Sequence, residues 1–237
     1  DVLKRKKEWR QKNSFAPSSL GYHGQCPRYW YYAFNGAEFS YDPDPLGVAN
    51  MNNGTSAGVR IAEMLKEADI LVDAEVEVIY DDPPIHGYID ALVMWQDEEM
   101  VVEVKTTRTN TWNYRSTPNV ETGYQLLQLL LYMHATDHDK GFVLTENKDT
   151  NEFFVLPVKM TEHNKKLVED TLAWMRTVKD NADNGELPTR PFTRSSMNCK
   201  NCPVKATCYP EDYKRGSVNG HDPNPGTITL IPLEVPK

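Results

Sequence analysis

The sequence predicts an α/β fold in which the core elements follow the order helix, three strands, helix, strand (αβββαβ). Three strand-like segments with alternating apolar residues lie between segments of helical periodicity. The chain has 237 residues, of which 39% are hydrophobic, enough for one large core. We recognise no internal repeat and therefore predict one domain with additions at both ends.

The first half of the core is expected to be a short helix followed by a three-stranded meander. Residues 54–68 place Val59, Ile61 and Leu65 at helical spacing, and Thr55 or Ser56 is available as an N-terminal cap. Strands are predicted over 71–80, 85–95 and 99–106. The turn-forming sequence Asp-Asp-Pro-Pro at 81–84 separates the first two.

The second half of the core is expected to alternate helices and strands. The Leu- and Gln-rich segment 121–135 predicts a buried helix, and two strands follow at about 141–146 and 152–158. A long helix over about 161–182 ends near Asn184-Gly185, a favourable helix stop.

Two of the predicted strands carry residues suited to metal-assisted chemistry. Alternate residues of a strand share a face, so Glu103 and Lys105 point the same way. If the neighbouring strand pairs beside them as a hairpin, Asp90 reaches the same point. Carboxylate ligands suit Mg or Mn, which can polarise a phosphoryl oxygen and activate water. The alternative is an ordinary solvated charge pair between Glu103 and Lys105.

The Leu-rich helix adds Gln128 and Tyr132, which share one helical face. Both side chains could project from the helix towards the carboxylates. The alternative is that Tyr132 packs in the core with its hydroxyl reaching solvent.

All four cysteines lie outside the predicted core. Cys26 is near the start, and Cys199, Cys202 and Cys208 cluster near the end. An acidic protein of intracellular character favours a metal site over disulfides, and a Cys-x2-Cys pair is too tight for an easy bridge. One distant cysteine followed by Cys-x2-Cys-x5-Cys favours an iron-sulfur cluster, with zinc as the alternative.

Charge and hydropathy restrict the class of protein. The formal net charge of −8 argues against a protein that coats nucleic acid, although a nuclease needs only a local basic groove. The candidate groove charges, which could equally be a solvated start of the chain, are Lys4, Arg5, Lys6, Lys7, Arg10, Lys12 and Arg28. No run of 18 apolar residues exists, so we expect no membrane partner and a cytoplasmic location.

The series Asp90, Glu103-x-Lys105 and Gln128-x3-Tyr132 in this order of elements resembles the PD-(D/E)XK nuclease superfamily in its RecB-like branch. The flanking cysteines make the chain most similar to the iron-sulfur members, in particular the stand-alone CRISPR-associated exonucleases and their phage relatives. The resemblance covers about residues 18–210. It implies a restriction-endonuclease-like core with a mixed central sheet flanked by helices, and N- and C-terminal segments joined by the cluster.

The resemblance also implies roles for individual residues. Asp90, Glu103 and the backbone carbonyl of Val104 would bind the catalytic Mg or Mn, and Lys105 would act on the attacking water. Gln128 and Tyr132 would position DNA and the reaction centre. A largely structural 4Fe-4S cluster would be held by Cys26, Cys199, Cys202 and Cys208. The aromatic residues 29–32 could stack on bases, although packing is the more common use of such residues.

One position departs from the family pattern. Family members commonly carry a His ligand after Gly-Thr-x-x, and this chain has Gly58 there. Water or another side chain would then complete the metal site, or activity would be reduced. The candidate substitutes are Glu63, Glu77 and His86.

We therefore expect a single nuclease domain over 1–237, with cluster-binding segments at 1–50 and 186–215, a nuclease core at 51–185 and a tail at 216–237. The expected activity is metal-dependent exonucleolytic hydrolysis of single-stranded DNA ends in recombination, replication or end processing, in a prokaryotic or phage-infected cell. Recombination or replication proteins and a second copy of the chain are candidate partners. The alternatives are a DNA-binding or assembly subunit with weakened catalysis and a zinc-stapled interaction module.

Overall fold

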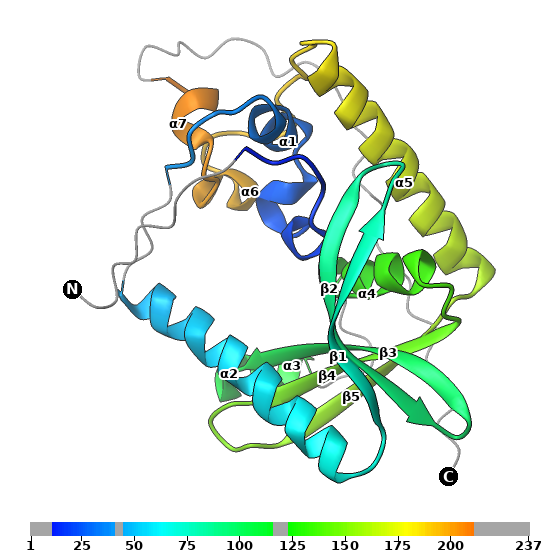
Figure 1. The fold of residues 1–237 in the computed structure, drawn as a ribbon. Coiled ribbons are helices and arrows are strands. Elements are labelled where there is room, and N and C mark those ends of the chain that lie inside the picture. Colours follow the sequence, from blue (N-terminus) through cyan, green and yellow to red (C-terminus); the bar gives the residue numbers. More distant parts are fainter. Residues whose placement is uncertain (1–10, 41–44, 116–122, 211–237) are drawn as a thin grey trace.

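A five-stranded mixed sheet with helices on both faces forms the centre of the protein (Figure 1). The computed structural model describes residues 11–40, 45–115 and 123–210. The strands are β1 (Leu71–Tyr80), β2 (Ile85–Trp95), β3 (Glu98–Thr107), β4 (Lys140–Asn147) and β5 (Phe153–Lys159). The described helices and 3-10 turns are η1 (Pro17–Ser19), η2 (Tyr22–Gln25), α1 (Pro27–Phe34), α2 (Pro45–Glu67), α3 (Thr109–Arg115), α4 (Gly123–Ala135), α5 (Glu162–Asp183), α6 (Met197–Lys200) and α7 (Lys205–Cys208).

The strands lie in the sheet in sequence order, β1-β2-β3-β4-β5. β1, β2 and β3 form an antiparallel meander, whereas β3 and β4 are parallel and β4 and β5 antiparallel. A parallel pair needs a crossover connection, and α4 lies within that connection. This topology places α4 against β3 and β4, next to the end of the meander.

β2 and β3 are paired over only part of their length. Their ladder runs from the Trp95–Glu98 pair to the Ala91–Val102 pair. Beyond it, the Val104 N–H donates to the Asp90 side chain. The separation opens space between the strands, and Asp90 and Glu103 lie directly beside it.

Two apolar clusters hold the sheet and helices together. The larger includes α4 and α5 side chains, such as Leu130 and Met175, packed with Val101 and Val143 of the sheet. The smaller joins Ile61 of α2 to β2, β3 and β4. Burial of these side chains from water is the main stabilising contribution, and it fixes α2 and α4 relative to the strands.

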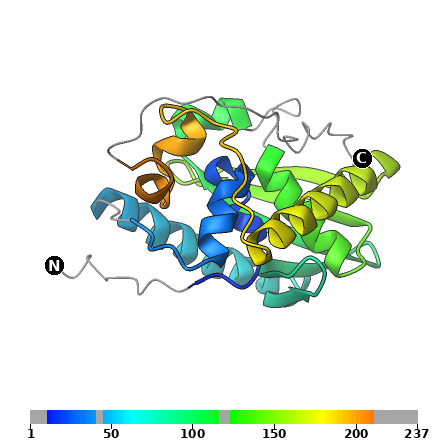
Figure 2. The ribbon, with the colours of Figure 1, turned by 90° about the horizontal axis from the view of Figure 1, so that it is seen from above.

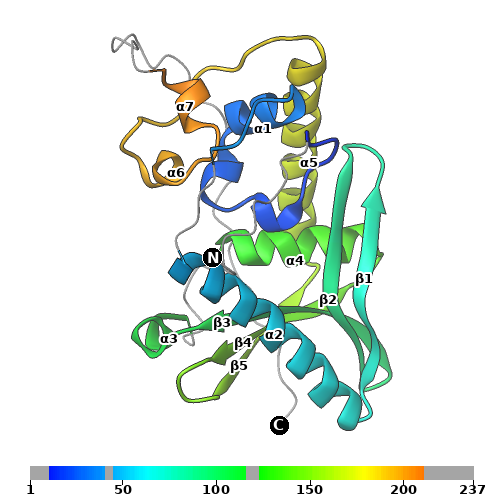
Figure 3. The ribbon, with the colours of Figure 1, turned by 60° about the vertical axis from the view of Figure 1, so that its left-hand side comes forward.

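The N-terminal and C-terminal segments meet on the far side of α4 from the sheet. Figure 2 shows α1 between α5 and the pair formed by α6 and α7, and Figure 3 shows these segments together at one end of the molecule. The Ser40 Oγ donates to the Pro203 carbonyl (2.9 Å), and the Asn198 amide donates to Gln25 (3.3 Å). Segments more than 150 residues apart in the chain are thus joined directly.

The predicted elements are confirmed with small differences in their bounds. β1 and β2 have the predicted limits, and β3, β4, β5 and the long helix α5 differ from the predicted limits by one residue at each end. The Thr161 hydroxyl caps α5, and Gly185 follows it with φ of 71°. The start of α4 cannot be compared with the prediction, because 121 and 122 lie outside the described residues.

Several helical features were not predicted, among them the first part of α2 and the short helix α3. α2 begins at Pro45, nine residues before the predicted start, because Pro is well suited to a first helical position and polar Asn residues continue an exposed helix. The short helix α3 follows β3 directly and has no apolar periodicity to reveal it. No described helix has both the length and the apolar character needed to cross a membrane.

Candidate active site

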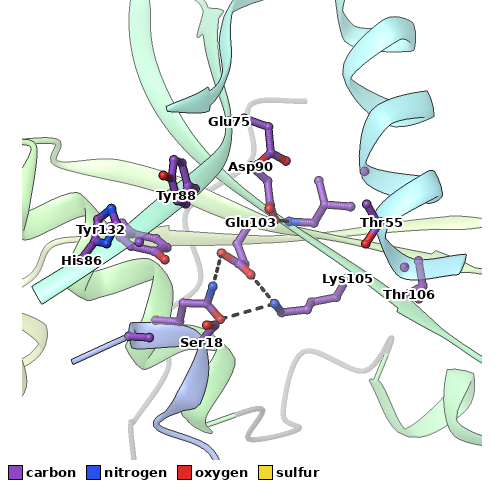
Figure 4. A pocket seen from close by; sticks show the side chains of 16 residues that line it. Ser18, Thr55, Glu75, His86, Tyr88, Asp90, Glu103, Lys105, Thr106 and Tyr132 are labelled. Atoms are coloured by element: carbon purple, nitrogen blue, oxygen red, sulfur yellow. Dashed lines mark hydrogen bonds and ion pairs between the residues drawn. The ribbon is translucent and has the colours of Figure 1, made fainter. Parts of the chain in front are cut away.

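A cavity of about 670 Å³ opens where α2, the β1–β3 meander, α4 and η1 meet (Figure 4). It is lined by Ala16, Ser18, Gly54, Thr55, Gly58, Glu75, His86, Gly87, Tyr88, Asp90, Glu103, Val104, Lys105, Thr106, Gln128 and Tyr132. All the predicted catalytic residues therefore line one cavity, although they are drawn from two strands and a helix.

Glu103 and Lys105 lie on the same face of β3, as the strand period requires. The Lys105 ammonium donates to Glu103, and the Gln128 amide donates to the other Glu103 oxygen (2.9 Å). Glu103 is only 1% exposed. The interpretation of these residues as a solvated charge pair is therefore wrong, because a buried carboxylate needs partners of this kind.

Asp90 reaches the same site from β2. Its Oδ2 accepts a hydrogen bond from the Val104 N–H (2.6 Å), at the point where β2 and β3 have separated. This bond fixes the position of one Asp90 oxygen beside the backbone of Val104. The two carboxylates predicted to act together are thus brought together by the meander.

Burial makes the ionised form of both carboxylates costly. It raises the pKa of Glu103 to about 7, against the opposing effect of Lys105. It also raises the pKa of Asp90, which the Val104 N–H and Lys105 lower only in part. Both groups would be stabilised as anions by an additional positive charge.

The charge of the lining residues fits a bound cation. Three carboxylates, those of Glu75, Asp90 and Glu103, face the cavity, and Lys105 is its one lysine or arginine among the described residues. Oxygen-rich donors of this kind suit Mg or Mn. Across the described residues, however, no group of three or more His, Cys, Asp or Glu side chains is placed so that it could hold a metal ion.

Tyr132 approaches the cavity beneath β2 and is 2% exposed. A Cβ added at Gly87 would lie 2.3 Å from the Tyr132 hydroxyl, so this close approach requires glycine. Burial raises the pKa of Tyr132, and the charges of Glu103 and Asp90 add to the effect. The phenol therefore remains neutral and can donate a hydrogen bond into the cavity.

Glu75 and Tyr88 are among the lining residues that the interpretation of the sequence missed. The register of β1 and β2 places Glu75 between the Ala74–Ala91 and Val76–Ile89 pairs, level with Asp90. Tyr88 precedes Asp90 by two residues on the same face of β2. Strand alternation alone could have shown that Tyr88 shares a face with Asp90. The register that brings Glu75 opposite Asp90 could not be obtained from local sequence.

Gly58 lines the cavity, and a Cβ there would meet nothing within 4 Å. Of the three candidate substitutes for an imidazole at this position, His86 alone lines the cavity, and its Nε2 is 2.9 Å from Glu77. Glu63 and Glu77 do not belong to the lining.

The four cysteines converge where the terminal segments meet. None forms a disulfide, and Cys199 and Cys208 share a small buried cluster. Burial raises the pKa of Cys26 to about 12 and that of Cys202 to about 11, and in both cases neighbouring cysteines contribute. Backbone N–H groups also point at these sulfurs and favour their thiolate forms.

Arg28 is buried two residues after Cys26, and its Nε has no hydrogen-bond partner among the described residues. The prediction that it lines a DNA groove is wrong, because Arg28 is only 7% exposed and its guanidinium lies over the Tyr32 ring and donates to the Tyr32 hydroxyl. A buried positive charge with an unpaired N–H group is costly without a partner, so this position favours an anionic group nearby. Of the other predicted groove charges, Lys12 lies over the Trp30 ring, and those before residue 11 fall outside the described residues.

The aromatic segment 29–32 is mainly a packing element. Tyr29 and Trp30 are buried, and the Trp30 indole donates to the Gly24 carbonyl (2.8 Å). These two rings cannot offer a free face to a base, so packing is the confirmed interpretation for them.

Comparisons with known proteins agree with this arrangement. The sequence model of the PD-(D/E)XK nuclease superfamily matches residues 51–209. The crystal structure of SSO0001 is similar, with 15% identity, a TM-score of 0.51 and coverage of 87% of this chain and 90% of that chain. LHK-Exo, an alkaline exonuclease from Laribacter hongkongensis, was solved in complex with dAMP and is 14% identical, with a TM-score of 0.53 and coverage of 73% and 91%. No curated protein sequence matches. The family match covers more than half of the chain, which therefore belongs to the PD-(D/E)XK nuclease superfamily.

Proposed function

We propose that this nuclease is a metal-dependent exonuclease that hydrolyses phosphodiester bonds at single-stranded DNA ends, in recombination, replication or end processing. The observation that carries the proposal is the convergence of Asp90, Glu103 and Lys105 in one cavity beside Gln128. LHK-Exo, the solved exonuclease with a similar fold, supports an exonucleolytic activity.

Each side chain has a defined task in this proposal. Asp90, Glu103 and the Val104 carbonyl would hold Mg or Mn, which when bound polarises a phosphoryl oxygen and lowers the pKa of water. Lys105 orients the attacking water and stabilises the negative charge that develops on the phosphate. Gln128 holds Glu103 in place, and the neutral Tyr132 hydroxyl donates to the substrate.

The second part of the proposal is a structural 4Fe-4S cluster bound by Cys26, Cys199, Cys202 and Cys208. Four free thiols from two distant segments influence one another, and the unpaired Arg28 Nε is two residues from the first. Thiolate sites of this kind hold iron-sulfur clusters. The cluster would fasten α1 to α6 and α7.

The test of nuclease function is degradation of single-stranded DNA labelled at either end, with Mg or Mn, by anaerobically purified protein. We expect metal-dependent shortening that Glu103→Ala reduces about 100-fold or more. Glu98→Ala removes a carboxylate from the same strand outside the cavity and should cleave as the wild type does. Absence of shortening by wild-type protein with both metals would favour a DNA-binding or assembly subunit instead.

The cluster has its own test. We expect broad visible absorbance and an iron content of about four per chain, both lost in Cys202→Ser. If the protein is colourless and contains zinc, the iron-sulfur proposal is wrong and the cysteines form a zinc site. Because the cysteines lie on the far side of α4 from the carboxylates, this outcome would leave the nuclease proposal standing.

A further inference from the structure

An exposed pair of rings stands at the mouth of the candidate active site. His86 and Tyr88 lie on the same face of β2 as Asp90, at two-residue intervals, and all three line the cavity. The ring centroids are 5.5 Å apart, with an angle of 56° between the planes. Tyr88 is 47% exposed, so part of its ring is accessible to a ligand at the edge of the cavity.

A single carboxylate holds both rings in place. Glu77 Oε1, on the neighbouring strand β1, lies 2.9 Å from His86 Nε2 and accepts a hydrogen bond from the Tyr88 hydroxyl (3.3 Å). The rings are therefore oriented before any ligand arrives, which reduces the entropic cost of binding to them.

The chemistry around Tyr88 selects a base over a phosphate. Glu77 accepts a hydrogen bond from the Tyr88 hydroxyl, and Glu75 lines the same cavity, so the local field repels anions. An uncharged base, in contrast, can stack on an aromatic face, and this interaction is the common device of proteins that bind single strands. Bases inside a duplex have both faces covered by neighbouring pairs, whereas an unpaired base can offer a face to the ring.

We propose that the exposed face of Tyr88, oriented by Glu77 and flanked by His86, stacks on an unpaired base of the strand whose phosphate enters the Asp90–Glu103–Lys105 site. The inference rests on the proposed function and adds a basis for single-strand selection. Tyr88 is then a substrate-positioning residue. It is coupled to the site through Gly87, against which the Tyr132 hydroxyl packs.

Binding in EDTA tests the stacking without cleavage. A single-stranded oligonucleotide with 2-aminopurine near one end is titrated with protein, and fluorescence reports stacking of that base. We expect Tyr88→Ala to weaken binding about tenfold and to remove the fluorescence change. Tyr88→Phe keeps the ring but loses the hydrogen bond to Glu77, so it should recover the fluorescence change and most of the binding. Trp95→Ala removes a ring of similar exposure from the other end of β2, outside the cavity, and should leave binding unchanged.

A second arm uses a series of oligonucleotides, each with a single abasic position. At the position whose base stacks on Tyr88, the missing base should weaken wild-type binding by about the same factor as Tyr88→Ala does. The variant should show no further loss with that oligonucleotide, because both changes remove the same contact. Independent effects at every position, or unchanged binding by Tyr88→Ala, would overturn the stacking.

Cleavage of single-stranded DNA is measured in parallel and separates the two proposals. If the wild type cleaves single strands but Tyr88→Ala binds them as the wild type does, the nuclease proposal stands and the stacking proposal is wrong. Binding to duplex DNA alone, without cleavage of single strands, removes both.

Discussion

The Asp90 carboxylate accepts a hydrogen bond from the backbone N–H of Val104, 2.6 Å away and 14 residues later in the chain. The bond replaces a ladder contact at the point where β2 and β3 separate. It unites the two strands while leaving the cavity open. One candidate metal-binding side chain is therefore held by the residue whose carbonyl is a candidate ligand.

Glu103→Gln should change how stability depends on pH. Burial raises the pKa of Glu103 from 4.5 to about 7, so the folded state binds this proton more tightly than the unfolded chain. The resulting stability is complete below about pH 4.5 and is lost as pH rises through about 7. Thermal unfolding in EDTA should therefore show the variant gaining in Tm relative to the wild type between these values.

Mg should raise the Tm of wild-type protein above pH 7 and have little effect on Glu103→Gln, because the cation stabilises the ionised carboxylate. A constant difference in Tm between the two proteins across the pH range would contradict the assignment of the raised pKa to Glu103.

Glu75→Gln should weaken metal binding. Glu75 faces Asp90 across β1 and β2 and has φ of 52°, a left-handed conformation that is rare for a residue without a short polar side chain and often marks a functional site. Loss of one cavity charge should raise the Kd for Mn about tenfold, measured by calorimetry. Glu67→Gln, at the exposed end of α2, is the matched control. Equal Kd values for the two variants would exclude Glu75 from the metal site.

Gly58→His should tighten metal binding. The position lines the cavity with no atom within 4 Å of a new Cβ, so an imidazole can be accommodated. Gly58→Ala is the control for helix propensity, because replacing glycine within α2 contributes up to about 1 kcal/mol of stability in either variant. We expect both to raise the Tm in EDTA and only His to lower the Kd for Mn. A Kd unchanged by His would place Gly58 beyond reach of the metal.

Gly87→Ala should displace Tyr132. The added methyl group would lie 2.3 Å from the Tyr132 hydroxyl. Overpacking of this kind costs about 1–3 kcal/mol, which unfolding by denaturant would measure. Gly87→Ala combined with Tyr132→Phe removes the clashing oxygen and should recover part of the loss. Additive destabilisation in the double variant would show that the two residues do not interact.

The sequence by itself determined the five strands, the main helices of the core and most of the candidate site. Alternation placed Glu103 and Lys105 on one face of a strand, helical spacing placed Gln128 and Tyr132 on one face of a helix, and apolar periodicity predicted the strands nearly to the residue. These are local properties, since backbone geometry repeats every two or 3.6 residues and dictates which neighbours share a face.

Only the tertiary structure decided which distant residues meet. The burial of Glu103, the position of Glu75 opposite Asp90 and the exposure of Tyr88 at the cavity mouth depend on the register of β1, β2 and β3 and on where α2 and α4 pack. Arg28 illustrates the same limit, because its charge suggested a surface role and its neighbours in the fold bury it. Such contacts arise from the packing of residues far apart in the chain, which local periodicity does not specify.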